Sequence, residues 1–213
     1  MEQVSILNSR NEWTTLSRVG NAIVAVSNNG TRELMRVGWD VYQCTFIPVF
    51  NGAQRMDSFV GLNVEHSNRG EERDYLVVLS AEGVVARTQV FVSALGGIYN
   101  MGDGVWAVPT WFRDGPESFV RGFGAREWHV DLEQFITSAL SHNGFLYLPM
   151  YRGSVYVINT KGEIVTYVPP RYSKDLSSAH GRVYVNSKGV FVETGYHSFQ
   201  FDPETGTLIG QVW

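Results

Sequence analysis

The feature that most constrains this chain is an internal repeat of about forty residues, each copy of which is built around a hairpin. The clearest copies are residues 154–167 (SVYVINTKGEIVTY) and 198–212 (SFQFDPETGTLIGQV). In both, inward and outward side chains alternate, the chain turns at a glycine (Gly162 or Gly206), and the alternation resumes. This pattern is typical of two antiparallel β-strands joined by a tight turn.

The turn glycine serves as a ruler along the whole chain. The glycines expected at the turn between the third and fourth strands are Gly30, Gly83, Gly122 or Gly124, Gly162 and Gly206. They divide the 213 residues into five units, each with four expected strands. The second unit is the longest because it contains a polar insertion at residues 63–74, which we expect to be a loop.

A sheet of four strands cannot bury both of its faces alone, whereas similar sheets arranged radially cover one another. The sequence therefore predicts an all-β chain that forms a single five-bladed β-propeller of four-stranded antiparallel blades, one domain over residues 1–213. The expected blades are residues 1–40, 41–91, 92–135, 136–174 and 175–213. Segments 31–36 and 131–140, the best helix candidates, are expected to be strand or loop. A β-sandwich or two stacked β-domains is the alternative.

The fourth and fifth units resemble the blades of quinoprotein-type (PQQ-type) propellers, whose fourth strand carries an Asp-x-x-Thr-Gly-x-x-x-Trp pattern. The closest stretch is residues 202–213 (DPETGTLIGQVW), where the tryptophan comes three residues late. In the fourth unit, residues 159–167 (NTKGEIVTY) are shorter and end in tyrosine. The resemblance implies the fold and not quinone chemistry, because no cofactor-binding or calcium-binding residue of that family can be placed here. We expect no cofactor.

Composition excludes several classes of protein. The formal net charge of −4 argues against a non-specific nucleic-acid binder, which would carry a basic stripe. The single cysteine, Cys44, cannot form an intrachain disulfide and is expected to be a small buried side chain. No stretch resembles a signal peptide or the ~20 apolar residues of a membrane helix. We therefore expect cytoplasmic synthesis and no membrane insertion.

Two pairs of residues are the candidate binding sites. Trp111 and Phe112 precede a polar loop, so they form the expected exposed aromatic pair, suited to stacking on a sugar or anchoring a protein. Trp128 and His129 open a segment in which His129, Asp131 and Glu133 share one side of a strand. Those three residues are candidates for metal binding or acid–base chemistry, but a solvated outer strand explains them better. We therefore expect neither catalytic nor metal-binding residues.

The predicted function is that of a non-enzymatic structural or interaction propeller. We expect it to be a subunit of a larger assembly, such as a tail or surface component of a bacteriophage virion, with other protein subunits as partners. One alternative is a carbohydrate-binding, lectin-like propeller that takes a surface glycan. The other is a small glycoside hydrolase, which needs two carboxylates ~5 to 10 Å apart. Its candidates are Glu65, Asp103, Glu117 and Glu193.

Overall fold

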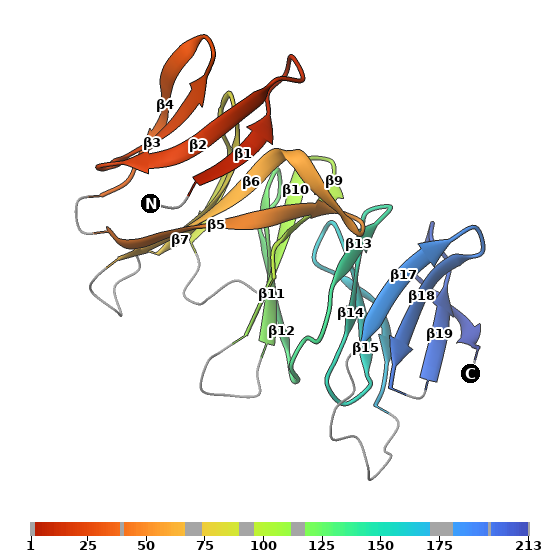
Figure 1. Ribbon diagram of the computed structural model, residues 1–213. Helices are drawn as coiled ribbons and strands as arrows, with labels where there is room; N and C mark the ends of the chain where they lie inside the picture. Colours follow the sequence, from red (N-terminus) through yellow and green to blue (C-terminus); the bar gives the residue numbers. More distant parts are fainter. Residues whose placement is uncertain are drawn as a thin grey trace. The chain divides into compact units, whose positions relative to one another are not determined.

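The computed structural model describes residues 3–38, 41–66, 74–89, 96–111, 118–170, 181–195 and 197–212. All the regular elements in these ranges are β-strands, as the repeat predicts (Figure 1). Within the same ranges, no helix is long and apolar enough to cross a membrane. The chain forms two compact units: unit 1 comprises residues 1–49 and 55–98, and unit 2 comprises residues 50–54 and 99–213.

Unit 1 contains the first two quartets of strands, except for the β5–β6 turn and its adjoining residues 50–54, which belong to unit 2. They are β1 (Gln3–Leu7), β2 (Trp13–Val19), β3 (Ala22–Ser27), β4 (Gly30–Arg36), β5 (Val41–Asn51), β6 (Gln54–His66), β7 (Tyr75–Ser80) and β8 (Gly83–Gln89). Strands β1 to β4 form a sheet in chain order, with each strand antiparallel to the next. Strand β4 covers segment 31–36, so that segment is strand and not helix.

The core of unit 1 lies between apolar side chains of these two quartets. Ile6, Leu16 and Ile23 come from the first quartet, and Leu62 and Val77 come from the second. The third strand of the second quartet, β7, has the sequence YLVVLS and is buried on both faces. A continuous apolar run bounded by turns is what such a doubly covered strand requires.

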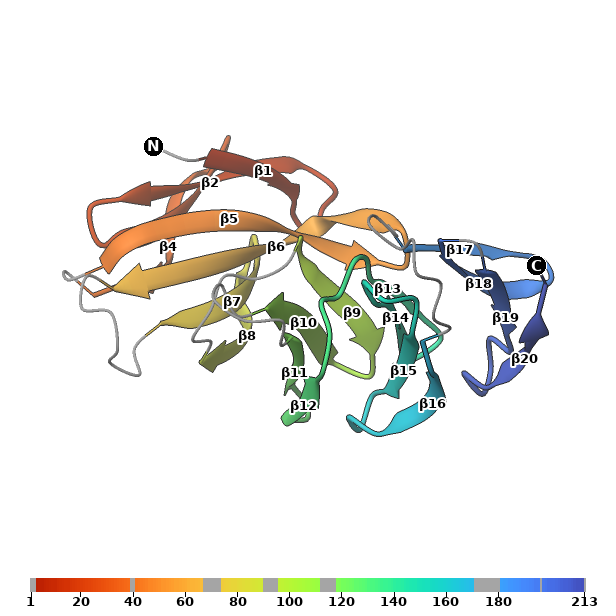
Figure 2. The ribbon, with the colours of Figure 1, turned by 90° about the horizontal axis from the view of Figure 1, so that it is seen from below.

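Unit 2 contains the other three quartets. They are β9 (Ile98–Gly102), β10 (Val105–Trp111), β11 (Ser118–Gly124), β12 (Trp128–Leu132), β13 (Leu140–His142), β14 (Phe145–Pro149), β15 (Val155–Asn159), β16 (Ile164–Val168), β17 (Arg182–Asn186), β18 (Gly189–Thr194), β19 (His197–Phe201) and β20 (Leu208–Gln211). Strands β13–β16 and β17–β20 form two sheets in chain order (Figure 2). Between β12 and β13 the chain is irregular, with one isolated bridge between Ile136 and Met150.

The described strands group into four sheets, so the expected count of five blades is not confirmed. Strands β5–β8 and β9–β12 belong to one eight-stranded sheet, in the order β12-β11-β10-β9-β5-β6-β7-β8. The five quartets are nevertheless present in chain order, and each is a run of consecutive antiparallel hairpins. The repeat in the sequence therefore marks hairpin units, whereas backbone pairing between strands decides how many separate sheets they make.

The predicted turn glycine is found in all five quartets. Each turn between the third and fourth strands holds a glycine with positive φ, at Gly30 (119°), Gly83 (145°), Gly124 (97°), Gly162 (81°) and Gly206 (68°). L-residues rarely adopt this backbone conformation, which explains why glycine recurs there. The structure also settles the choice left open in the third quartet, because Gly124 takes the turn and Gly122 lies within β11.

Candidate functional site

The predicted site residues Trp128 and His129 begin β12, the edge strand of the eight-stranded sheet. Trp128 is half-buried, and its Nε1 donates a hydrogen bond to the carbonyl oxygen of Thr160 at 3.0 Å. Its indole lies against two glycines, since a Cβ added to Gly122 would clash with the ring and one on Gly162 would lie 2.7 Å from its Cγ. This environment gives Trp128 a packing role between β11 and the β15–β16 turn.

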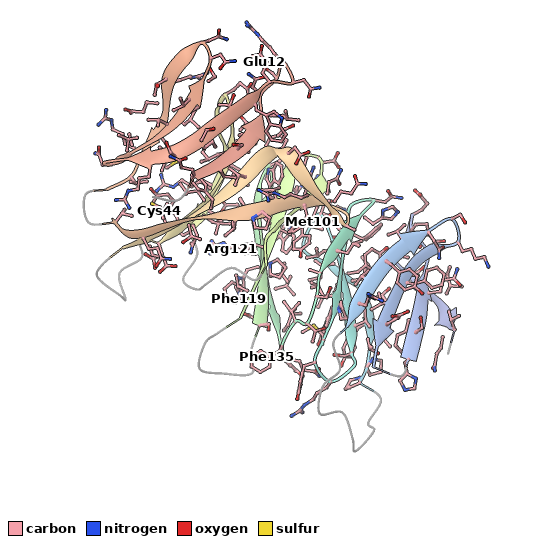
Figure 3. The ribbon with its side chains drawn as sticks, viewed as in Figure 1. Glu12, Cys44, Met101, Phe119, Arg121 and Phe135 are labelled. Carbon is pink, nitrogen blue, oxygen red and sulfur yellow. The ribbon has the colours of Figure 1, made fainter. Side chains whose placement is uncertain are left out.

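His129 lies on the exposed side of β12. Its Nε2 is 2.8 Å from Oδ1 of Asp131, and the two side chains are 45% and 84% exposed. Its ring also packs against Phe119 of β11, with centroids 4.9 Å apart, and Arg121 of β11 is its neighbour across the strands (Figure 3). An ion pair this exposed contributes about 0–1 kcal/mol. The arrangement resembles a solvated strand surface.

The third member of that cluster does not join it. Glu133 follows the end of β12 at Leu132, and a strand separates residues i and i+4 by ~13 Å. Among the residues that the structure describes, no group of three histidines, cysteines, aspartates or glutamates could hold a metal ion. Of the other candidates, Phe112, the side chain of Trp111 and the carboxylate candidate Glu117 lie outside the described residues.

Unit 1 contains a polar cleft of about 350 Å³ that sequence reasoning missed. We call it the turn cleft. It lies among the β1–β2, β3–β4 and β7–β8 turns, and its lining residues are Asn8, Ser9, Arg10, Glu12, Thr14, Ala25, Ser27, Asn29, Gly30, Thr31, Arg32, Ala81 and Glu82. Glu12 marks the β1–β2 turn in Figure 3. Because the three turns come from distant parts of the sequence, no local motif could have revealed the cleft.

A hydrogen-bonded turn shapes one wall of the turn cleft. The side-chain Oδ1 of Asn8 accepts the backbone N–H groups of Arg10 and Glu12, both at 2.9 Å. Its Nδ2 donates to Oε2 of Glu12 at 3.2 Å. The β15–β16 turn repeats these contacts with Asn159 and Glu163 in an Asn-x-x-x-Glu sequence. This spacing is the signal in the sequence that could have predicted the β1–β2 turn.

Glu82, on the β7–β8 turn, is hydrogen-bonded to residues of the β1–β2 and β3–β4 hairpins. Its Oε1 accepts the backbone N–H of Ser9 at 2.8 Å, and its carbonyl oxygen accepts Nη2 of Arg32 at 2.7 Å. The hydrogen bond from Ser9 holds the pKa of the Glu82 carboxyl below its usual range. Because hydrogen bonds to the charged form favour it, Glu82 stays ionised at neutral pH.

Cys44 on β5 has a charged neighbour that the local sequence does not reveal. Nη1 of Arg18 on β2 lies 3.7 Å from Sγ of Cys44 (labelled in Figure 3), and the thiol is half-buried. Burial nevertheless raises the pKa of the Cys44 thiol, with the nearby arginine offsetting only part of that effect. A thiol that stays protonated is a weak nucleophile, so this environment favours a structural role.

One face of the sheet β17–β20 lies away from the core shared with β13–β16 and is only partly exposed. Val190, Val192 and Phe199 belong to the core cluster shared with β13–β16. Since successive side chains of a strand point to opposite faces, their neighbours form the other side, which we call the open face. At its centre Tyr184 and Phe191 stack with centroids 5.3 Å apart and rings inclined by 8°. Tyr184 is 36% exposed, whereas Phe191, on which it stacks, is 7% exposed, so Tyr184 presents the accessible ring of the pair.

The edge strand β20 adds further apolar surface beside that sheet. Leu208 is 42% exposed and Ile209 is 59% exposed. Edge strands present unpaired backbone groups, and natural proteins usually protect them with charge or coverage. The sheet β17–β20 thus combines an apolar edge strand with a partly exposed aromatic pair.

Comparisons with known proteins give structural matches only. The sequence matches no protein-family model, and no curated protein matches it significantly. The structure is similar to that of the Dos1 propeller, with a TM-score of 0.50, 9% identity, and coverage of 98% of this chain and 58% of that one. It also matches BamB from Moraxella catarrhalis, with a TM-score of 0.48, 14% identity, and coverage of 99% and 63%.

These matches bear on the fold alone. The likeness to the Dos1 propeller identifies the fold as β-propeller-like and all-β. The chain spans less than two thirds of the length of either structure. The more specific resemblance to quinoprotein-type blades stays a prediction, because identities this low do not distinguish one kind of propeller from another.

Proposed function

We propose that this chain is a non-enzymatic protein-interaction module with a β-propeller-type fold, acting as a subunit of a larger assembly. The observation that carries the proposal is the open face of β17–β20, with its stacked Tyr184 and Phe191, beside the apolar edge strand β20. Tyrosine and other aromatic residues are enriched where proteins bind one another, because they offer a large rigid contact area. The many antiparallel hairpins supply a rigid support for that surface.

Site-specific photocross-linking in the producing cells tests this proposal. A photoreactive phenylalanine analogue replaces Tyr184 on the open face, and in a control chain it replaces Tyr151, which is 40% exposed on the turn before β15. We expect one dominant protein adduct from position 184 and none from position 151, identified by mass spectrometry. Equal or absent cross-linking at the two positions would contradict the proposal.

The larger assembly that we propose is a virion, with the chain in a tail or surface position. Support comes from Tyr184 and the apolar edge strand β20, which offer a surface for contact with other subunits. Mass spectrometry of purified particles, together with antibody-labelled micrographs, tests this assignment. Detection of the chain in particles at a fixed copy number is the expected result, and its confinement to the soluble cell fraction would contradict it.

Carbohydrate binding is the second candidate, and the stacked aromatic pair is the observation that favours it. A lectin built from repeats would place exposed aromatic residues at equivalent strands of several quartets. The exposed rings of Trp13, Tyr167 and Tyr184 instead lie on second, fourth and first strands. A glycan array gives the test: binding that is lost in Tyr184→Ala would support the lectin, and an array without binding would remove it.

A further inference from the structure

We propose that the turn cleft of unit 1 binds a small polar ligand through a single carboxylate group. This inference goes beyond the protein-interaction function, since it concerns another surface. The cleft volume of about 350 Å³ lies at the lower end of the range of small-molecule sites, roughly 300–1,000 Å³. Only two of its lining residues, Ala25 and Ala81, are apolar, so the ligand must be polar over most of its surface.

Two guanidinium groups in the turn cleft have hydrogen-bond donors to spare. One oxygen of each carboxylate is engaged, that of Glu12 by Asn8 and that of Glu82 by the backbone of Ser9. In contrast, the guanidinium of Arg10 has no partner among the described residues. That of Arg32 donates one bond, to a carbonyl oxygen, and retains its other donors. A carboxylate is the planar acceptor that matches a guanidinium with two parallel hydrogen bonds.

A hydroxyl in the cleft is also available to a ligand. Thr14 lines the cleft and is only 4% exposed. Within the described part of the chain its hydroxyl forms no hydrogen bond, and it is not fully enclosed, so it can bond to a molecule in the cleft. A ligand oxygen in the cleft would satisfy this hydroxyl. Thr14 follows Trp13 on β2, where strand alternation turns its side chain towards the core side of the sheet.

The charges of the cleft require the anionic group to sit close to the arginines. Arg10 and Arg32 attract an anion, and Glu12 and Glu82 repel it. The formal charges of these four side chains cancel, so binding depends on a small planar group that reaches the guanidinium groups while staying away from both carboxylates. The hydrogen bonds of Asn8 and Glu82 hold the turns in place, which reduces the ordering cost of binding.

Titration of the full chain followed by ¹H–¹⁵N NMR tests the proposal. The probes are N-acetylglycine as a free small carboxylate, N-acetylglutamate amide as a peptide-like carboxylate, N-acetylglutamine amide as its neutral analogue, and inorganic phosphate at pH 8. We expect saturable shifts of the Ser9 and Thr31 amides with one or both carboxylates. Response to the peptide-like probe alone identifies a protein side chain as the source, and response to both identifies the carboxylate itself. Equal response to the neutral analogue or to phosphate would overturn the proposal.

Three variants locate the binding. Arg32→Gln and Arg10→Gln should each weaken carboxylate binding about tenfold, as expected for loss of a charge-assisted hydrogen bond. The guanidinium of Arg10 has no partner in the described ranges, so we expect its replacement to leave the fold intact. The control is Arg36→Gln on β4, because Arg36 pairs with Glu33 and does not line the cleft. We expect binding to the control within twofold of the parent chain. Equal weakening in all three variants, or no weakening in any, would overturn the proposal.

Discussion

The two last sheets of the chain share one hairpin pattern but differ in how they are covered. In β13–β16, Tyr147 and Val157 are cross-strand partners that are fully buried against β17–β20. In β17–β20, the corresponding partners are Phe191 and Gln200 on the open face. The repeat thus preserves strand pairing while the composition of each face follows its surroundings. The covered pair, Tyr147 and Val157, is fully buried, whereas the pair on the open face combines the buried Phe191 with the polar Gln200.

Exchanging residues between the two faces should give the largest effect and tests directly whether one face is covered and the other open. Val157→Gln places an amide in a fully buried site, and we expect the free energy of unfolding to fall by about 3 kcal/mol. Gln200→Val removes one exposed hydrogen bond, to the carbonyl of Lys188, and should change stability by about 0.5 kcal/mol or less. Urea denaturation measures both. Similar losses in the two variants would show that the open face is covered.

Glycine substitutions sharpen the comparison at the turns. Gly162→Ala in the β15–β16 turn introduces a side chain at positive φ and against Trp128, so we expect a loss of about 1–3 kcal/mol. Gly210→Ala in β20 meets no atom within 4 Å and lies outside the positive-φ region. It should be neutral or slightly stabilising, because alanine restricts the unfolded chain. If Gly210→Ala instead lowers stability in the same denaturation experiment, the added methyl group must meet atoms near Gly210, which would contradict an uncovered open face.

Alkaline pH tests the burial of β13–β16 by a smaller effect. Burial, with help from nearby Tyr167 and Glu133, raises the pKa of Tyr156 to about 12, above the value near 10 of an unfolded chain. Because the folded state resists ionisation, this contribution to stability is intact below pH 10 and is lost as pH rises towards 12. Thermal unfolding of the parent chain and of Tyr156→Phe between pH 9 and 11.5 measures it. The variant should lose less stability with pH than the parent chain, and parallel pH profiles would contradict the assignment.

The smallest expected effect concerns a hydroxyl in the covered face. The OH of Tyr147 is buried and has no hydrogen-bond partner among the residues that the structure describes. Tyr147→Phe removes this unsatisfied group while keeping the edge-on contact with Phe201, so stability should be unchanged or rise by up to about 1 kcal/mol. Calorimetry compares it with Tyr184→Phe on the open face, for which we expect no change. A clear loss in Tyr147→Phe would mean that the hydroxyl is bonded in solution.

That residues 1–213 form a single domain stays a prediction, because it rests on the repeat alone. Cooperative unfolding would be its signature. A propeller-type domain should unfold in one transition monitored by tryptophan fluorescence and circular dichroism. Two separated transitions would assign independent folding to units 1 and 2.

Local pattern predicted the hairpins because strand alternation and turn glycines act over a few residues. The five positive-φ glycines, the four-strand quartets and the mostly apolar strand β7 all follow from the linear order of side chains. The same reasoning placed Trp128 and His129 on a strand but could not tell that Trp128 packs on Gly162, thirty-four residues later. Contacts at that separation depend on which sheets stack.

Sequence alone thus determined that the chain is all-β and built of repeated antiparallel hairpins, because these depend on neighbouring residues. Tertiary structure decided the rest. Backbone pairing joined two quartets into one sheet, stacking buried Val157 but left Gln200 on the open face, and three distant turns met to form the turn cleft. The physical reason is that burial and charge at these sites come from residues far apart in the chain, whose meeting no local periodicity encodes.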